Sequence, residues 1–119
     1  MSQRLDRLSD LVRAELAALM QREMRDPRVA LATVTRVDLS RDLGHAVVHV
    51  SALGNEEQRA SAIAALVHAR GFLRRELAHR LSSLRTTPEL KFVLDRGAEH
   101  SQRISDLLDE LKPGGESDS

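Results

Sequence analysis

The sequence predicts an α+β fold of two layers, in which helices pack on one small sheet. Apolar residues recur at helical spacing near the N-terminus, and two later stretches alternate apolar and polar residues on either side of a turn. A further helical region and a third alternating stretch follow. The predicted order is α-β-β-α-kink-α-β plus a short C-terminal helix. The chain has 119 residues, and we expect one domain over residues 1–111 and a disordered polar tail over 112–119.

The first helix is expected over residues 4–24. Its apolar residues recur every three or four positions, which gathers them on one face of a helix. They are Leu5, Leu8, Val12, Leu16, Leu19 and Met20. The dipeptide Asp26-Pro27 ends this helix, because the residue before a proline avoids the helical region.

Two strands are expected over residues 31–39 and 45–53. Alternation in the first strand gives one face consisting of Leu31, Thr33, Thr35, Val37 and Leu39. Alternation in the second strand gives one face consisting of Ala46, Val48, Val50 and Ala52. The residues between the strands, 40–44, are turn-like, so the two strands should form an antiparallel hairpin.

A second helical region begins after Asn55, a good helix cap that has Gln58 three residues later. Gly71 interrupts this region, and we expect a kink or a break there rather than one continuous helix. The expected inward-facing residues are Ile63, Leu66, Val67, either Phe72 or Leu73, Leu77 and Leu81.

The stretch Thr86-Thr87-Pro88 ends the second helical region. A third strand follows, in which the alternating apolar residues are Leu90, Phe92 and Leu94. A short helix should then begin at Ser101 and end before Pro113. Its apolar stripe is expected to consist of Ile104, Leu107, Leu108 and Leu111.

Composition excludes several classes of protein. The chain has no Cys, so it has neither disulfides nor Cys-ligated zinc or iron–sulfur sites. Its only aromatic residues are Phe72 and Phe92, which argues against an RNA-binding sheet that stacks bases on rings. No apolar run is long enough to cross a bilayer, and the N-terminus lacks the apolar stretch of a signal peptide. We therefore expect a cytoplasmic protein with no membrane partner.

The charge is balanced over the whole chain but is unevenly distributed. Residues 1–96 carry 16 basic and 12 acidic side chains, whereas residues 97–119 carry 2 basic and 6 acidic ones. Much of the basic excess lies in one stretch that contains Arg70, Arg74, Arg75, Arg80 and Arg85. Of the 18 basic residues 16 are Arg, whose planar fork binds phosphate through two hydrogen bonds. A genomic bias toward Arg codons is an equally good explanation of this excess.

The predicted order and several local sequences resemble the bacterial ribosome-binding factor A family, which has the type II K-homology (KH) topology. The matching stretches are QREMRDPR at 21–28, VDLSRDL at 37–43, ARGFLR at 69–74, RTTPELKF at 85–92 and, more weakly, SQRISDLL at 101–108. Each stretch alone is weakly specific. Together, in this order, they span about residues 4–111 and make the resemblance strong.

The resemblance implies a non-catalytic factor that binds the small ribosomal subunit and its ribosomal RNA during late biogenesis and rRNA processing. Ribosomal proteins would be further partners, and a role in cold adaptation is implied. In this family an Ala-x-Gly kink replaces the Gly-x-x-Gly loop of other KH domains, and Ala69-Arg70-Gly71 follows that pattern. The C-terminal end differs, because it is short and acidic where the family often has a long basic or mixed tail.

The kink is the first candidate RNA-binding site. Gly71 would let the chain turn, so that Arg70, Arg74 and Arg75 face outward and the free N–H groups of the next helix face a phosphate. Arg80 and Arg85 would extend this surface. The alternative is that Gly71 only permits close packing of helix and sheet, and that the arginines are an ordinary solvated face.

Arg22, Arg25, Arg28 and Arg41 form a second candidate cluster of phosphate contacts. The alternative for these residues is local pairing with the neighbouring acids, which are Glu23, Asp26 and Asp42. Both interpretations fit the sequence equally well. A further alternative for Arg41 and Asp42 is that they only stabilise the turn.

Catalytic, cofactor and metal sites are not expected. The chain lacks a Gly-x-Ser-x-Gly motif and a phosphate-binding Gly-rich loop with its Lys. His45 and His49 share a strand face but would lie about 13 Å apart, too far to bind one metal ion. Glu76 and His79 form one Glu-x-x-His pair, whereas a di-iron site needs two.

The main alternative function is a KH-like protein-interaction module without direct RNA contact. Its docking surface would be the edge of the hairpin or the apolar stripe of the C-terminal helix. The stripe could equally pack on its own domain, and we expect a monomer in solution. Added salt distinguishes the two functions, because it weakens RNA binding steeply and apolar association little.

Overall fold

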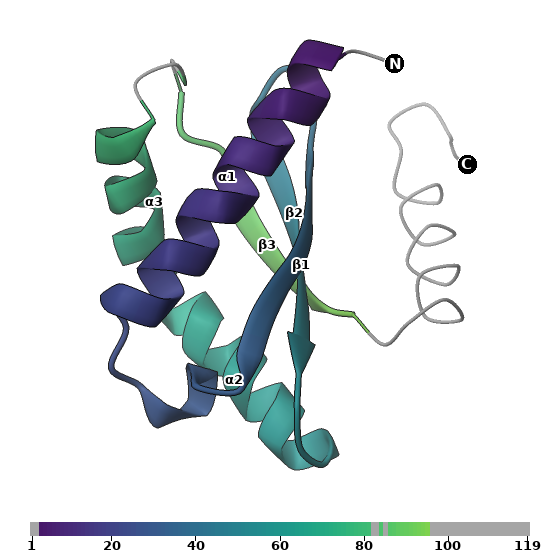
Figure 1. The fold of residues 1–119 in the computed structure, drawn as a ribbon, viewed down its shortest axis with the longest axis vertical. Helices are drawn as coiled ribbons and strands as arrows, with labels where there is room; N and C mark the ends of the chain where they lie inside the picture. Colours follow the sequence, from purple (N-terminus) through teal and green to yellow (C-terminus); the bar gives the residue numbers. More distant parts are fainter. Residues whose placement is uncertain (1–2, 82–83, 85, 96–119) are drawn as a thin grey trace, which may run out of the picture.

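The computed structural model describes residues 3–81, 84 and 86–95 (Figure 1). The elements are α1 (Gln3–Arg22), a 3₁₀ turn η1 (Pro27–Val29), β1 (Ala32–Leu39), β2 (His45–Ala52), α2 (Glu56–His68), α3 (Arg70–Arg80) and β3 (Glu89–Leu94). This order confirms the predicted α+β order as far as β3, and only η1 was not predicted. The expected C-terminal helix, its apolar stripe, the polar tail and Arg85 lie outside the described residues.

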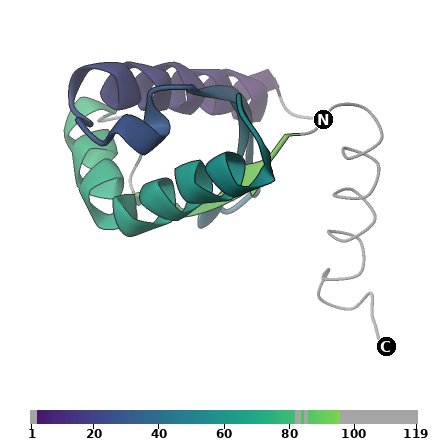
Figure 2. The ribbon, with the colours of Figure 1, turned by 90° about the horizontal axis from the view of Figure 1, so that it is seen from below.

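The sheet has the strand order β1-β2-β3, with β2 in the centre. β1 pairs with β2 in antiparallel orientation, which confirms the hairpin, and β3 pairs with β2 in parallel orientation. The three helices cover one face of this sheet, as Figures 1 and 2 show. Their apolar faces meet the sheet in one core, whose fully buried members include Val12, Leu16, Val48, Val50, Leu66, Leu73 and Leu77.

A β-bulge at Thr35 changes which residues of β1 face the core. Val34 lies opposite Val50 and Arg36 lies opposite His49, so Thr35 is an extra residue that reverses the alternation. Val34 is therefore buried before the bulge, and Val37 and Leu39 are buried after it. The prediction that Leu31, Thr33 and Thr35 share a face with Val37 and Leu39 was wrong. Leu31 is instead 54% exposed.

The second helical region is divided into α2 and α3, as predicted. Asn55 and Gln58 form the expected capping box, in which each side chain accepts from the other's backbone N–H at 2.8 Å. The break falls at Ala69, whose φ of −89° and ψ of 7° end α2.

Two expectations about these helices were wrong. Val67 is 41% exposed rather than inward-facing, because Leu66 alone of this pair faces the core. α3 also ends earlier than the predicted stop near Thr86, since Leu81 already departs from helical geometry with φ −119° and ψ 80°. The other inward-facing positions hold: Leu73, Leu77 and Leu81 are buried, and Ile63 and Phe72 are partly buried against the core.

The sheet face opposite the helices carries a buried histidine. His49 is 6% exposed, and its Nε2 lies 2.9 Å from Oδ2 of Asp38. Arg36 also contacts Asp38, with 3.1 Å between Nη2 and Oδ2. The hydrogen bond from His49 lowers the pKa of Asp38, and the charge of Arg36 adds to this effect. Asp38 thus provides a hydrogen-bond partner for the buried imidazole of His49.

We expect Asp38→Asn to lower the free energy of unfolding by about 1 kcal/mol at pH 7, because a half-exposed charged partner of His49 is lost. A lowered pKa in the folded state means that the carboxylate stabilises the fold above its unfolded pKa, near 3.9. That stabilisation is lost as the pH falls through the lower folded value. Urea unfolding should therefore show a difference between wild type and variant that shrinks between pH 7 and pH 3. A difference that is constant with pH would contradict this role.

Candidate nucleic-acid interface

The junction of α2 and α3 exposes the start of a helix. No side chain caps α3 at Ala69, and the first helical hydrogen bond runs from the Leu73 N–H to the Ala69 carbonyl at 3.0 Å. The N–H groups of Arg70, Gly71 and Phe72 precede that bond. Arg70 and Gly71 are exposed. These three N–H groups have no acceptor within α3 itself, so the junction can present them, with the positive end of the helix dipole, to a phosphate.

Gly71 is not needed for the chain to turn or to pack. Its φ is not positive, and the turn itself is made by Ala69. A Cβ at Gly71 would meet only Nη1 of Arg75, at 3.8 Å, which is ordinary contact. Close packing of helix and sheet therefore does not explain this glycine. The missing side chain instead leaves bare backbone at the start of α3, with the Arg75 guanidinium beside it.

Arg74 does not face outward as predicted. Its Nε donates to the carbonyl of Pro88 at 3.0 Å, and its Nη2 donates to the carbonyl of Thr87 at 2.9 Å. Nη1 also lies 3.5 Å from a carboxylate oxygen of Glu89. Arg74 thus holds the segment before β3 against α3. Its guanidinium is already paired within the protein.

Arg80 is also compensated within the chain. Its guanidinium lies 3.7 Å from Glu76, 3.8 Å from Glu23 and 4.0 Å from Glu15. Three carboxylates around one cation leave no positive surplus at this end of α3. Of the five arginines predicted for the kink surface, Arg70 and Arg75 remain without an ion-pair partner among the described residues.

The second predicted cluster is divided by the structure. Arg28 binds Asp26 through both Nε and Nη2, the latter at 2.6 Å, so local pairing holds for this residue. Arg22 and Arg25 are exposed and have no ion-pair partner within the described chain. Arg41 lies in the hairpin turn, separated from the other three by the whole length of β1.

The acids near these arginines have other functions. Asp42 accepts from the Ser40 hydroxyl at 2.7 Å and from the Gly44 N–H at 2.9 Å, and these bonds lower its pKa. Asp42 therefore stabilises the turn rather than pairing with Arg41. Glu23 pairs with Arg80, as described above, and not with Arg22 or Arg25.

The turn after α1 lies beside the kink. η1 packs against α2, as Figures 1 and 2 show. Hydrogen bonds from the Arg28 side chain and N–H lower the pKa of Asp26 to about 2, and the charge of His68, at the end of α2, contributes a smaller part. The structure thus brings the turn that contains Arg25 close to the end of α2, although 40 residues separate them in sequence.

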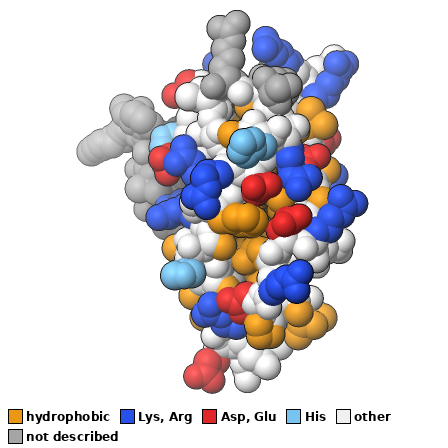
Figure 3. All heavy atoms as spheres, turned by 90° about the vertical axis from the view of Figure 1, so that its left-hand side faces the viewer, with side chains coloured by type: hydrophobic (Ala, Val, Ile, Leu, Met, Phe, Trp, Pro, Cys, Tyr) orange, Lys and Arg blue, Asp and Glu red, His pale blue; other side chains and the backbone are white. Residues whose placement is uncertain are grey.

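The face that carries α3 has a mixed charge pattern (Figure 3). Lys and Arg side chains are spread over it, and carboxylates and apolar side chains lie between them. This pattern fits a small number of separate phosphate contacts better than one continuous basic patch.

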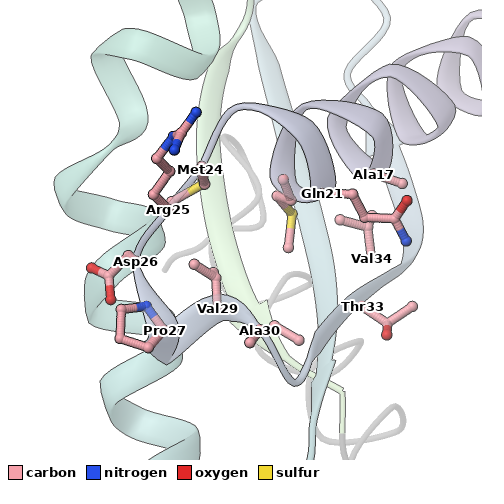
Figure 4. Close-up of a pocket in the computed structure, with 12 residues that line it drawn as sticks. Ala17, Gln21, Met24, Arg25, Asp26, Pro27, Val29, Ala30, Thr33 and Val34 are labelled. Atoms are coloured by element: carbon pink, nitrogen blue, oxygen red, sulfur yellow. The ribbon is translucent and has the colours of Figure 1, made fainter.

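A cleft between α1 and β1 was not predicted from the sequence (Figure 4). It has a volume of about 410 Å³ and is lined by the last turns of α1, by η1 and by the first residues of β1. Met20 and Met24 line it, and the chain has only 3 Met. The sequence feature that could have indicated this cleft is the occurrence of two methionines within five positions, beside Arg22 and Arg25.

No helix among the described residues is long and apolar enough to cross a membrane. The same part of the chain contains no group of three or more potential metal ligands.

The elements and the kink together define the class of this protein, a KH-like α+β domain in which an Ala-x-Gly junction joins the two central helices. The family model described as "Ribosome-binding factor A" matches residues 4–108, and the chain belongs to this family. Ribosome-binding factor A from Thermomicrobium roseum is 46% identical over 111 residues, which cover 93% of this chain and 85% of the relative. That from Chloroflexus aggregans is 40% identical over 92% of this chain and 87% of the relative.

Solved structures agree with this assignment. The crystal structure of ribosome-binding factor A from Thermus thermophilus matches with a TM-score of 0.68 and 34% identity, over 76% of this chain and 94% of that one. The solution structure of a Thermotoga maritima relative matches with a TM-score of 0.71 and 35% identity, over 83% and 93% of the two chains. A Thermus thermophilus model fitted into a cryo-EM map of a complex between 30S and ribosome-binding factor A matches with a TM-score of 0.64 and 34% identity, over 78% and 97%.

Proposed function

We propose that this chain is a non-catalytic assembly factor that binds the small ribosomal subunit through its ribosomal RNA. Membership of the ribosome-binding factor A family supports this, as does the likeness to the Thermus thermophilus protein fitted into a 30S complex. The factor would act in the cytoplasm during late biogenesis and rRNA processing, and would matter most in the cold, when RNA refolds slowly.

The start of α3 is the observation that supports RNA contact most directly. Arg70 precedes Gly71 as the first residue of α3, and Nη1 of Arg75 would lie 3.8 Å from a Cβ at Gly71, near the positive end of the helix. Backbone N–H groups and Arg guanidinium groups are the donors that bind phosphate in RNA complexes. Arg22 and Arg25 provide further cations at the neighbouring turn.

The mode of binding follows from the residues that are absent from the sequence. The chain has only 2 aromatic residues, and Phe92 is buried while Phe72 is partly buried against the core. Stacking on rings therefore contributes little, and contacts to phosphate should dominate. Such contacts release counterions, so the affinity should fall steeply as salt is added.

Co-sedimentation of the tagged protein with ribosomal particles, at low and at high salt, tests the proposal. We expect the protein to migrate with free small subunits at low salt and to remain at the top of the gradient at high salt. A protein that stays at the top of the gradient in both salts would contradict subunit binding.

A contact with a ribosomal protein is the second candidate function, and an apolar surface favours it. Leu31 and Leu53 are 54% and 66% exposed and adjacent, since the Leu53 N–H donates to the Leu31 carbonyl at 3.2 Å. Together with Pro27, Ala52 and Ala62 they line a second cleft. Association that survives high salt would favour this candidate over RNA binding.

Gly71→Ala separates an RNA role of the kink from a structural one. The added methyl has room, and alanine favours a helix by about 1 kcal/mol over glycine, so the variant should be at least as stable as wild type. We expect its affinity for small subunits to fall about tenfold, because the methyl group holds a phosphate away from the backbone N–H groups. Urea unfolding and quantitative co-sedimentation measure the two effects. Unchanged affinity would show that the RNA does not approach Gly71.

A further inference from the structure

We propose that the cleft between α1 and β1 binds a single unstacked base of RNA; this inference rests on the proposed RNA-binding function. The cleft measures about 410 Å³, which lies within the range of about 300–1,000 Å³ that is usual for small-ligand sites. A base flipped out of its stack needs apolar contact on its flat faces and polar groups at its edge. The cleft offers both.

The floor of the cleft is apolar. Met20, Val29 and Val34 line it and are 7%, 5% and 4% exposed, so they form a fixed surface of the core. Met24 adds a second thioether, and sulfur makes favourable contact with aromatic rings. These methionines can replace the aromatic side chains that other RNA-binding domains use and that this chain lacks.

Polar groups stand at the sides of the cleft. Gln21 and Thr33 lie on one side, and Arg25 and Asp26 lie on the other (Figure 4). Within the described residues neither the Gln21 amide nor the Thr33 hydroxyl has a hydrogen-bond partner. An amide and a hydroxyl both donate and accept, so together they can contact the edge of a base.

The charges at the mouth favour a nucleotide over an apolar peptide side chain. Arg25, which lines the cleft, is exposed and has no ion-pair partner in the described part of the chain. The carboxylate of Asp26 is neutralised by Arg28, with 2.6 Å between Oδ2 and Nη2. The mouth therefore carries a positive surplus, which suits the phosphates on either side of the bound base.

Two probes of equal charge test this pocket on the full chain: a short single-stranded oligoadenylate and an abasic ribose-phosphate strand of the same length. We expect the oligoadenylate to bind about tenfold more tightly, the usual effect of one stacked base. Ala17→Leu fills the cleft from α1. It should therefore reduce the ratio of the two affinities, oligoadenylate over abasic strand, to about one and leave the affinity for the abasic strand unchanged. Ala14→Leu, the same change at an exposed position of the same helix outside the cleft, should keep the ratio.

A second variant tests the same pocket in case Ala17→Leu does not fold. Gln21→Ala removes only an exposed amide and should lower the ratio several-fold. The proposed base pocket would be contradicted if the wild type bound the two strands equally well. It would also be contradicted if both variants kept the tenfold preference of the wild type for the oligoadenylate. Loss of small-subunit binding by Ala17→Leu with a wild-type ratio near one would assign the cleft to a protein instead. Failure of the wild type to bind either strand or the subunit would contradict the proposed function itself.

Discussion

Replacing Arg70 and Arg75 together with glutamate should abolish the salt-sensitive association with small subunits and leave the fold intact. Arg70 begins α3 and Arg75 lies one turn further along it; both are exposed and have no ion-pair partner among the described residues. Two hydrogen bonds to phosphate, each worth about 1.5–3 kcal/mol, would be lost. A loss of about 3 kcal/mol corresponds to a fall in affinity of about a hundredfold, and repulsion by the new carboxylates adds to it.

The control for this variant is Arg4→Glu with Arg7→Glu, which makes the same change in net charge at exposed positions of α1. If net charge alone governs binding, both double variants will lose affinity equally. If the kink makes the contact, the control will co-sediment almost as wild type. Urea unfolding of both proteins should give midpoints near that of wild type. Normal association of the Arg70 and Arg75 variant would remove the kink from the interface.

The elements of this fold were predictable because their signals are local. The apolar stripe of α1, the capping residues Asn55 and Gln58, and the alternation in β2 each lie within a few turns or one strand of sequence. The bulge at Thr35 was not predictable in this way. It depends on the pairing of β1 with β2 and on bonds from Thr35 to His49 and Asp95, which lie 14 and 60 residues away.

In the candidate site, too, contacts between residues close in sequence were predictable and contacts with distant residues were not. Arg28 and Asp26 are two residues apart, and their pairing was one of the two interpretations of the sequence. Arg70 and Arg74 lie one helical turn apart and look equivalent in sequence. Arg74 is used in the fold only because α3 packs beside β3, which brings carbonyls from 13 and 14 residues away to its guanidinium. The cleft beside α1 likewise requires β1, a neighbour that a helical pattern cannot reveal.

Arg74→Met should destabilise the protein by about 2 kcal/mol, because two hydrogen bonds from a charged group are lost from a half-buried site. The carbonyls of Thr87 and Pro88 accept these bonds, and Pro88 itself is fully buried at the entrance to β3. Methionine keeps most of the apolar stem, so the loss reports on the guanidinium and not on packing. Arg74→Lys should recover only part of the stability, since one ammonium group lacks the planar fork that reaches both carbonyls.

Arg75→Met is the matched control, because it makes the same substitution at the next residue, on the exposed side of α3. Urea unfolding should show a large loss of stability for Arg74→Met and almost none for Arg75→Met. Co-sedimentation, at a temperature where both variants are folded, should show the opposite order, with reduced association for Arg75→Met and near-normal association for Arg74→Met. Two adjacent arginines would then have separate functions, one in holding β3 to α3 and one in contacting RNA. Equal effects of the two variants on both measurements would show that the division of their roles is wrong.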